Sequence, residues 1–399
     1  MTFRSVFILL IIMICSPSAW AVNLDISTGG SIKSLNYFLD DGPLSKNNIL
    51  SADSFRLDLK GRFGAATEVE FSLEQRLLWA NRSGGVGLNP NTVNRYFDLE
   101  TVQNDGGKLS GATQVDRFSF HVDHGSFSWT LGRQAIGFGR ISLFSPLDVI
   151  APFPPDALDI DVRPGVDAVK INRYFGLAGQ LGGVAVFSDE TDDRSYLLTA
   201  GENIAKVDLL FLGGRLRGRP MVGVGLAGEF GAVGIKSEIS WYRGADVGQS
   251  GGDLKEHFSV AALEGWYRFD NGLILIAEYL YNGFGSQDPQ GYVAVANSAP
   301  IKEGLGFLLG RQYVLLGPSY QMHPLVTLNG LMIYNIEDES ILFRPLLAVS
   351  LSDNLQMDLF WSFTAGRQPS RDQLTGLPLV RSEFGSLAES GGLFLRWYF

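Results

Sequence analysis

Two glutamates are spaced so that they could share a proton or a cation. Glu264 and Glu278 flank a predicted turn at residues 270–272, and strands joined by this turn would place the two carboxylates opposite each other on one face. Carboxylates in that position raise each other's pKa. The alternative is that water and a neighbouring base such as Arg268 screen the two charges, and a wet face favours this alternative.

The other side chains capable of catalysis do not form a recognisable site. Ser119 and His121 lie two positions apart on one predicted strand face, without a third group to complete a hydrolase site. The four histidines lack the spacing of metal ligands, and no C-x-x-C-H segment is present to attach haem. The sequence therefore predicts no catalytic residue, no metal site and no cofactor, and we expect that the protein is not an enzyme.

A glycine pattern at residues 223–228 matches a phosphate-binding motif. The segment reads Gly-Val-Gly-Leu-Ala-Gly, which fits G-x-G-x-x-G. That motif binds a dinucleotide only between a strand and a helix. Here it lies inside a strand that continues through Phe230 towards another strand, so we expect the glycines to relieve crowding or curvature on a sheet.

Two acidic runs, at residues 189–193 and 337–339, fall in predicted loops. Carboxylate oxygens suit Ca²⁺ or Mg²⁺, which could bridge these loops to phosphates. Solvation of a charged loop is the simpler interpretation, so the runs are not assigned as metal sites.

Strands must position these residues, because apolar side chains recur at alternate positions along most of the chain. From Val22 onward the alternating segments are about 9 to 11 residues long, the length of a tilted membrane-spanning strand. The predicted strands are residues 23–38, 53–63, 67–77, 114–122, 127–138, 165–174, 177–188, 194–199, 205–214, 220–230, 233–243, 257–269, 273–283, 312–321, 326–336, 341–350, 355–365 and 390–399. The segment 194–199 is the least regular of them.

The connections between these strands alternate between tight and long. Tight turns are predicted at residues 64–66, 124–126, 175–176, 231–232, 270–272, 322–325 and 351–354, and long loops at 78–113, 139–164, 244–256, 284–311 and 366–389. The pattern is typical of an all-β, transmembrane, antiparallel up-and-down barrel with short periplasmic turns and long extracellular loops. Periplasmic termini require an even strand number. Counting 194–199 gives 18 strands, which we favour, and dropping it with one other strand gives 16.

The carboxyl-terminal residues form a strand that needs a partner. Leu393, Leu395, Trp397 and Phe399 share one face at period two. An unpaired apolar edge promotes aggregation, and pairing with the first strand would close a barrel. A terminal apolar strand that ends in Phe resembles the closing strand of Gram-negative outer-membrane β-barrels. The resemblance implies that the barrel-assembly machinery binds this strand.

Residues 1–21 have the pattern of a secretory signal peptide. Arg4 precedes an apolar run, and Ala19-Trp20-Ala21 is a small-x-small cleavage site. Cleavage near Ala21 would leave 22–399 as one barrel domain without cysteine, because Cys15 is the only one. These features predict the outer membrane of a Gram-negative bacterium, in contact with its lipid and lipopolysaccharide. The 32 Lys and Arg against 42 Asp and Glu argue against a nucleic-acid partner.

One predicted strand leads into a loop rich in proline and apolar residues. Leu131-Gly132-Arg133-Gln134 resembles the strand end before the constriction loop of Gram-negative porins. The loop 139–164 has too many prolines for a regular strand and is too apolar for bulk water. We predict that it folds into the lumen, and the alternative is an outward cap over the rim. The residues predicted to border the lumen or its constriction are Arg133, Arg140, Asp148, Asp156, Asp159, Asp161, Arg163, Asp167, Lys170, Glu264 and Glu278.

The hairpin at residues 55–77 predicts its own register. With residues 64–66 as the turn, positions that sum to 130 face each other. The predicted lumen pairs are Arg62 with Glu68, Lys60 with Glu70 and Arg56 with Glu74, and the predicted lipid-facing pairs are Leu59 with Phe71 and Leu57 with Leu73.

Three classes of function remain open. The resemblance to porins implies a channel for passive diffusion of small hydrophilic solutes or ions, since a barrel of this size encloses an aqueous interior. Alternatively, the barrel is a sheath for a periplasmic partner, such as a multihaem cytochrome in an electron conduit. An outer-membrane enzyme is disfavoured because no catalytic constellation is evident.

Overall fold

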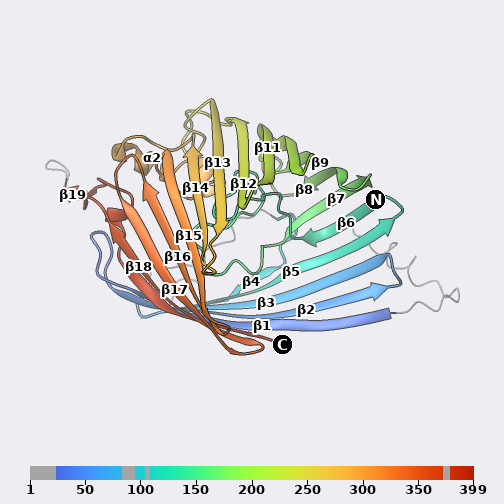
Figure 1. Cartoon of the computed structure of the whole chain (residues 1–399), viewed down its shortest axis with the longest axis horizontal. Helices are drawn as coiled ribbons and strands as arrows, with labels where there is room; N and C mark the ends of the chain where they lie inside the picture. The colour runs from blue at the N-terminus through green and yellow to red at the C-terminus, as the bar shows by residue number, and fades with distance from the viewer. Residues whose placement is uncertain (1–23, 83–94, 104–107, 372–377) are drawn as a thin grey trace.

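The computed structural model describes residues 24–82, 95–103, 108–371 and 378–399, and it is a closed antiparallel barrel of 18 strands (Figure 1). The predicted leader lies outside these residues. The wall contains, in order, β1 (Leu24–Leu39), β2 (Asn48–Phe63), β3 (Thr67–Ala80), β5 (Leu109–His124), β6 (Phe127–Gln134), β7 (Val166–Phe175), β8 (Gly179–Val186), β9 (Ser195–Ile204), β10 (Val207–Leu216), β11 (Arg219–Phe230), β12 (Val233–Arg243), β13 (His257–Arg268), β14 (Ile274–Asn282), β15 (Gln312–His323), β16 (Val326–Asn335), β17 (Ile341–Ser352), β18 (Leu355–Ala365) and β21 (Ser390–Tyr398).

The carboxyl-terminal strand closes the barrel, as predicted. β21 pairs with β18 on one side and with β1 on the other. The Phe399 amide donates to the Gly30 carbonyl at 3.1 Å, and the Gly30 amide donates to the Phe399 carbonyl at 2.9 Å. The Phe399 ring lies over Gly30, where a Cβ atom would be only 2.6 Å from the ring. Glycine at this position therefore makes room for the terminal aromatic.

The barrel has 18 strands because the least regular predicted strand, 194–199, is present as β9. The predicted start of the next strand at Ala205 is wrong, since Ala205 and Lys206 have φ angles of 53° and 68° and form the turn between β9 and β10. Non-glycine residues in the left-handed region are uncommon, and the sequence carries no glycine here to mark the turn. The seven predicted tight turns all lie at the same end of the barrel, which we call the short-turn end.

Several short elements in the connections were not predicted. They are β4 (Glu100–Gln103), η1 (Pro289–Gly291), α2 (Tyr292–Ala296), α3 (Ala299–Lys302), β19 (Ser370–Arg371), β20 (Pro378–Leu379) and η2 (Phe384–Ser386). Within the described residues, no helix is long and apolar enough to cross a membrane.

The predicted register of the β2–β3 hairpin is confirmed for every pair. Arg62 and Glu68 form an ion pair at 3.0 Å, and Lys60 and Glu70 form one at 3.4 Å. The predicted ion pair between Arg56 and Glu74 is wrong, because Arg56 turns instead to Asp58 at 2.8 Å and Asp116 at 2.7 Å.

The interior of the barrel has two unlike halves. The inward faces of β1, β2, β3 and β5 are polar, and their residues include Lys33, Arg56 and Arg117. On the strands from β7 to β17, many inward side chains instead form a buried apolar cluster, which includes Val184, Leu197, Leu212, Met221, Val260, Leu280, Leu315, Ile333 and Leu342. Part of the barrel interior is thus a dry core.

Candidate functional site

The connection between β6 and β7, residues 135–165, folds into the barrel and is called here the inner loop (Figure 1). Three carboxylates on neighbouring strands accept hydrogen bonds from its backbone. The Arg140 amide donates to Glu238 at 2.6 Å, the Ser142 amide donates to Glu264 at 2.5 Å, and the Phe144 amide donates to Glu278 at 3.2 Å. These glutamates belong to β12, β13 and β14, so one wall of the barrel holds the first half of the loop.

Glu264 and Glu278 face each other in register, as the turn spacing predicted. Both are almost fully buried, and Arg268 is not the base that accompanies them. Lys236 forms an ion pair with Glu264 at 2.8 Å. The inner loop covers this part of the wall. Its backbone amides therefore donate the hydrogen bonds to Glu264 and Glu278 that were expected to come from water.

An apolar contact fixes the same half of the loop. Leu147 is fully buried and lies on the inward face of β11. A Cβ atom on Gly225 would lie 3.0 Å from the Leu147 side chain, and one on Gly223 would lie closer still. Gly223 and Gly225, two glycines of the rejected phosphate-binding pattern, thus leave a socket for the Leu147 side chain. Larger residues at these positions would crowd Leu147.

The second half of the inner loop contacts the other side of the barrel. Lys33 on β1 donates to Asp159 at 2.7 Å and to Asp161 at 2.9 Å. Asp161 also lies 3.4 Å from Arg396 and accepts from the Tyr398 hydroxyl at 2.5 Å. Asp161 therefore links β1 to β21 from inside, across the seam where the barrel closes. On β17, Arg344 donates to the Asp156 carbonyl at 2.6 Å.

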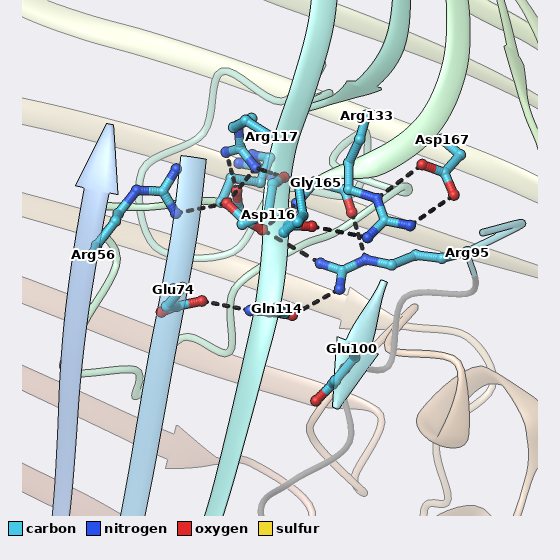
Figure 2. A network of polar contacts seen from close by, with 12 residues as sticks. Arg56, Glu74, Arg95, Glu100, Gln114, Asp116, Arg117, Arg133, Gly165 and Asp167 are labelled. Carbon is cyan, nitrogen blue, oxygen red and sulfur yellow. Dashed lines mark hydrogen bonds and ion pairs between the residues drawn. The ribbon is translucent and has the colours of Figure 1, made fainter. Parts of the chain in front are cut away.

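A β-bulge in β5 brings two adjacent charged residues to the interior. Ser72 pairs with Arg117 and Leu73 pairs with Val115, so Asp116 has no partner on β3. The extra residue resets the alternation of the strand. As Figure 2 shows, Asp116 accepts hydrogen bonds from three arginines. The distances are 2.7 Å from Arg56, 2.6 Å from Arg117 and 3.3 Å from Arg95.

Asp116 also fixes the end of the inner loop. The Gly165 amide donates to Asp116 at 3.0 Å, and Arg95 donates to the Gly165 carbonyl at 2.9 Å. Arg117 donates to the Arg163 carbonyl. Within the loop, Arg163 pairs with Asp148 at 2.6 Å and lies over the Phe153 ring. The end of the inner loop, at Arg163 and Gly165, is therefore fixed to the wall by the buried charge network around Asp116.

Arg133 and Asp167 lie inside the wall and do not border the lumen, contrary to the prediction. Their side chains are 1% and 6% exposed and pair at 2.8 Å. Arg133 donates to the Phe97 carbonyl at 2.6 Å, and the Phe97 amide donates to Asp167 at 2.9 Å. β4 pairs with β5 farther along, beyond the end of the short strand β6. The Arg133–Asp167 ion pair thus fixes the segment at Phe97, which leads into β4. β4 then completes the wall beside β5 at the point where the chain leaves β6 for the inner loop.

The sequence matches no protein-family model and no curated protein sequence. Similar solved structures include a BenF-like porin from Pseudomonas fluorescens Pf-5, with a TM-score of 0.60 and 9% identity over 94% of this chain and 98% of that chain. OccAB1 from Acinetobacter baumannii has a TM-score of 0.58 and 9% identity, covering 96% and 98%. OccK5 (OpdH) from Pseudomonas aeruginosa has a TM-score of 0.56 and 11% identity, covering 94% and 98%. The chain is a porin-like β-barrel. At these identities the likeness concerns the fold alone.

The porin-like barrel keeps an open cleft beside its polar wall. The cleft has a volume of about 640 Å³, and its lining includes Arg62, Glu68, Arg117, His121, Gln134 and Lys170. Among the predicted residues only Lys170 lies in this cleft, and no ion pair joins it to another described residue. Arg140 lies 3.9 Å from Asp208 on β10. Asp148, Asp161, Arg163, Glu264 and Glu278 make contacts that fix the inner loop, whereas Asp156 is exposed and only its carbonyl is bonded.

A buried acidic cluster joins three connections at the other end of the barrel from the short turns. Glu383 accepts hydrogen bonds from the Tyr313 hydroxyl at 2.5 Å, from Asn335 at 2.8 Å and from the Leu309 amide at 2.8 Å. The Glu383 amide donates to Asp338 at 2.7 Å. Asp338 belongs to the acidic run 337–339, and it is buried whereas Glu339 is exposed, so solvation explains only part of that run. No ion pair to either carboxylate is found among the described residues.

This cluster predicts that docking of the connection 366–389 depends on pH. Burial raises the pKa of Glu383 from its ordinary value of 4.5 to about 7. The docked state therefore binds the proton more tightly than the released state, so docking is strongest below about pH 4.5 and weakens as the pH rises through about 7. Hydrogen exchange at the Leu309 amide, corrected for its intrinsic rate, is expected to be faster at about pH 8 than at about pH 5.5. In the Glu383→Gln variant this difference should disappear, and an unchanged difference would contradict the assignment.

Proposed function

We propose that this chain is an outer-membrane channel through which small hydrophilic solutes or ions diffuse passively. The observation that carries the proposal is the wet, charged half of the interior. Arg62, near the short-turn end of β2, borders the open cleft of about 640 Å³ together with Arg117 and Lys170, which lie farther inside. Charged side chains around an open cleft favour water in the interior, and water-filled barrels of this size admit small solutes.

The passage that we propose includes the open cleft beside the polar wall of β2, β3 and β5 and continues past the contacts between that wall and the second half of the inner loop. The first half of the loop fills the apolar side and leaves no continuous polar surface there. Asp159 and Asp161 pair with Lys33 and still keep 40% and 28% of their side chains exposed, so this contact would place negative charge beside the passage. Narrow low-dielectric walls intensify the field of such groups, so the inner loop would set both the size limit and the charge preference.

The porin-like fold supports an outer-membrane location with the short-turn end in the periplasm. Removal of a leader near Ala21, assembly through the carboxyl-terminal strand and contact with lipopolysaccharide belong to the same proposal.

The sheath hypothesis requires an interior that admits a folded partner, whereas the inner loop already fills the half facing β7 to β17. We therefore keep the channel as the one proposed function.

Single-channel recording of the purified, folded protein in planar bilayers tests this function. We expect ohmic current steps of one size, because a fixed inner loop leaves one fixed passage. Swelling of proteoliposomes in sugars of increasing size would measure the cutoff independently. Heat-denatured protein from the same preparation is the control. A barrel that is folded by circular dichroism and heat-modifiable mobility, yet passes neither ions nor sugars, would overturn the proposal.

A further inference from the structure

Two basic side chains converge at the barrel end opposite the short turns. Lys255 precedes β13, Arg311 precedes β15, and residues 283–285 follow β14, which lies between these two strands. The Lys255 ammonium donates to the Gly283 carbonyl at 2.5 Å and to the Gly285 carbonyl at 3.5 Å. Arg311 donates to the same Gly285 carbonyl at 3.4 Å. Lys255 and Arg311 are called here the rim pair.

No carboxylate neutralises the rim pair. In the part of the chain that the structure describes, no ion pair joins either residue to an acidic side chain. Two acidic residues of the same connections are engaged elsewhere, since Asp253 pairs with Arg219 at 2.7 Å and Glu337 accepts from the Gln312 amide at 3.0 Å. Burial and the charge of Arg311 both lower the pKa of Lys255. The two like charges therefore lie close together without compensation.

The rim pair also has donors to spare. An ammonium has three N–H donors and a guanidinium has five, so the carbonyls of Gly283 and Gly285 use only part of them. The Arg311 Nε atom is buried and has no hydrogen-bond partner among the described residues. A buried donor without an acceptor is costly. An anion with several oxygens would satisfy these donors and offset the repulsion, and phosphate suits a point charge beside a guanidinium fork.

Outward aromatic side chains indicate the depth of the rim pair in the membrane. On the lipid-facing side, the rings of Trp241 and His257 stack at 5.3 Å, and His257 is two residues from Lys255. Tyr281, two residues before Gly283, is 36% exposed. Aromatic residues of this kind gather where hydrocarbon meets the headgroups. The rim pair, one step beyond them, is therefore at the level of the headgroup phosphates.

We propose that the rim pair binds a phosphate group at the outer rim of the barrel. Its depth favours a phosphate of an outer-leaflet lipopolysaccharide over phosphate dissolved in water. Lysine and arginine bind phosphate directly, so no divalent ion is needed, in contrast to a bridge from the acidic runs 189–193 and 337–339. The inference rests on the outer-membrane location within the proposed function, and it does not depend on the passage of solutes.

Binding of a fluorescent deep-rough lipopolysaccharide to the purified, folded protein tests the proposal. The rim variant, Lys255→Gln with Arg311→Gln, loses both charges and should bind at least about tenfold more weakly than wild type. Lys46→Gln with Arg82→Gln is the matched control, because it removes two charges at the same end, where Arg82 contacts Asn47. This control should bind as wild type does. Equal binding by all three proteins, or the same loss in the control, would overturn the proposal.

The chemistry of the ligand gives three further readouts. Dephosphorylated lipopolysaccharide should bind wild type as weakly as the intact form binds the rim variant. Inorganic phosphate distinguishes the source: if the rim variant lost only the binding of inorganic phosphate, the site would be supported and its ligand would be dissolved phosphate. Wild type should still bind lipopolysaccharide in EDTA. Binding that disappears in EDTA and ignores the rim substitutions would overturn the proposal in favour of the acidic runs.

A charge-preserving variant separates binding from folding. Lys255→Arg with Arg311→Lys should bind lipopolysaccharide as wild type does, and heat-modifiable mobility would verify that every variant is folded. The rim variant should also give the current steps of wild type, because neither residue lies on the proposed passage. A conducting barrel whose lipopolysaccharide binding ignores the rim substitutions would overturn this proposal and leave the channel. A silent barrel with rim-dependent binding would do the reverse.

Discussion

Replacing Asp116 by asparagine is expected to destabilise the barrel by about 3 to 5 kcal/mol, because it leaves Arg95 and Arg117 without their ion-pair partner and leaves Arg56 with Asp58 alone. The Asp116 side chain is 2% exposed, and it joins β2, the bulge of β5, the segment at Arg95 and the end of the inner loop. Urea unfolding of the protein folded into lipid vesicles would measure the change in free energy.

Asp123 provides the matched control for this prediction. It lies on the same strand and pairs with His121 at 3.3 Å, but its side chain is 58% exposed. Water screens such a pair, so Asp123→Asn should change the free energy of unfolding by less than about 1 kcal/mol. Similar, small effects of the two substitutions would mean that the network around Asp116 does not stabilise the barrel.

The barrel itself is predictable because membrane-spanning strands obey a strict period. Alternating apolar positions gave every strand of the wall, and the residues between strands gave the register of the β2–β3 hairpin. The same reasoning placed Glu264 opposite Glu278 and Phe399 beside β1. These features depend on neighbours in sequence or on one pairing across a short turn. Local chemistry is sufficient to determine them.

The bulge in β5 is a feature that the sequence signals but alternation alone does not resolve. Arg117, Ser119 and His121 share a polar face, which would place Asp116 towards lipid. A charge on that face is costly, and one extra residue in the strand avoids it. Adjacent charges in an otherwise alternating strand are thus a usable sign of a bulge. Its partners could not be predicted, because Arg95 and Gly165 arrive from distant connections.

The dry half of the interior also had a sign in the sequence. Leu209 and Leu210 are neighbours that face opposite sides of β10, and Leu197 and Leu198 do the same on β9. Apolar residues on both faces of a strand indicate burial on both sides. The inner loop and the connection 284–311 both contribute apolar side chains that cover this face, among them Phe144, Ile150 and Leu308. Which residues of the inner loop would meet which strand depends on the path of the loop, and no period determines that path.

Replacing Gly223 by valine is expected to displace the first half of the inner loop. The new side chain would occupy the socket of Leu147, and overpacking of this kind costs about 1 to 3 kcal/mol. Displacement would also remove the loop amides from Glu238, Glu264 and Glu278. In planar bilayers we expect the steady open level of the wild type to break up into noisy sublevels, because the loop then moves within the passage. Urea unfolding should show the cost even if the current were unchanged.

Two further variants make this prediction specific to the socket. Gly228→Val alters the same strand at an outward position, where a Cβ atom would make only ordinary contact with Val207 at 3.5 Å, so stability and current should resemble the wild type. Leu147→Ala alone should cost about 2 to 5 kcal/mol through the cavity that it leaves. Combined with Gly223→Val, however, it should cost less than the sum of the two single changes, because the valine fills the space that Leu147 vacates. Strict additivity would show that Gly223 and Leu147 do not meet, and the inner loop would then be held by its carboxylate contacts alone.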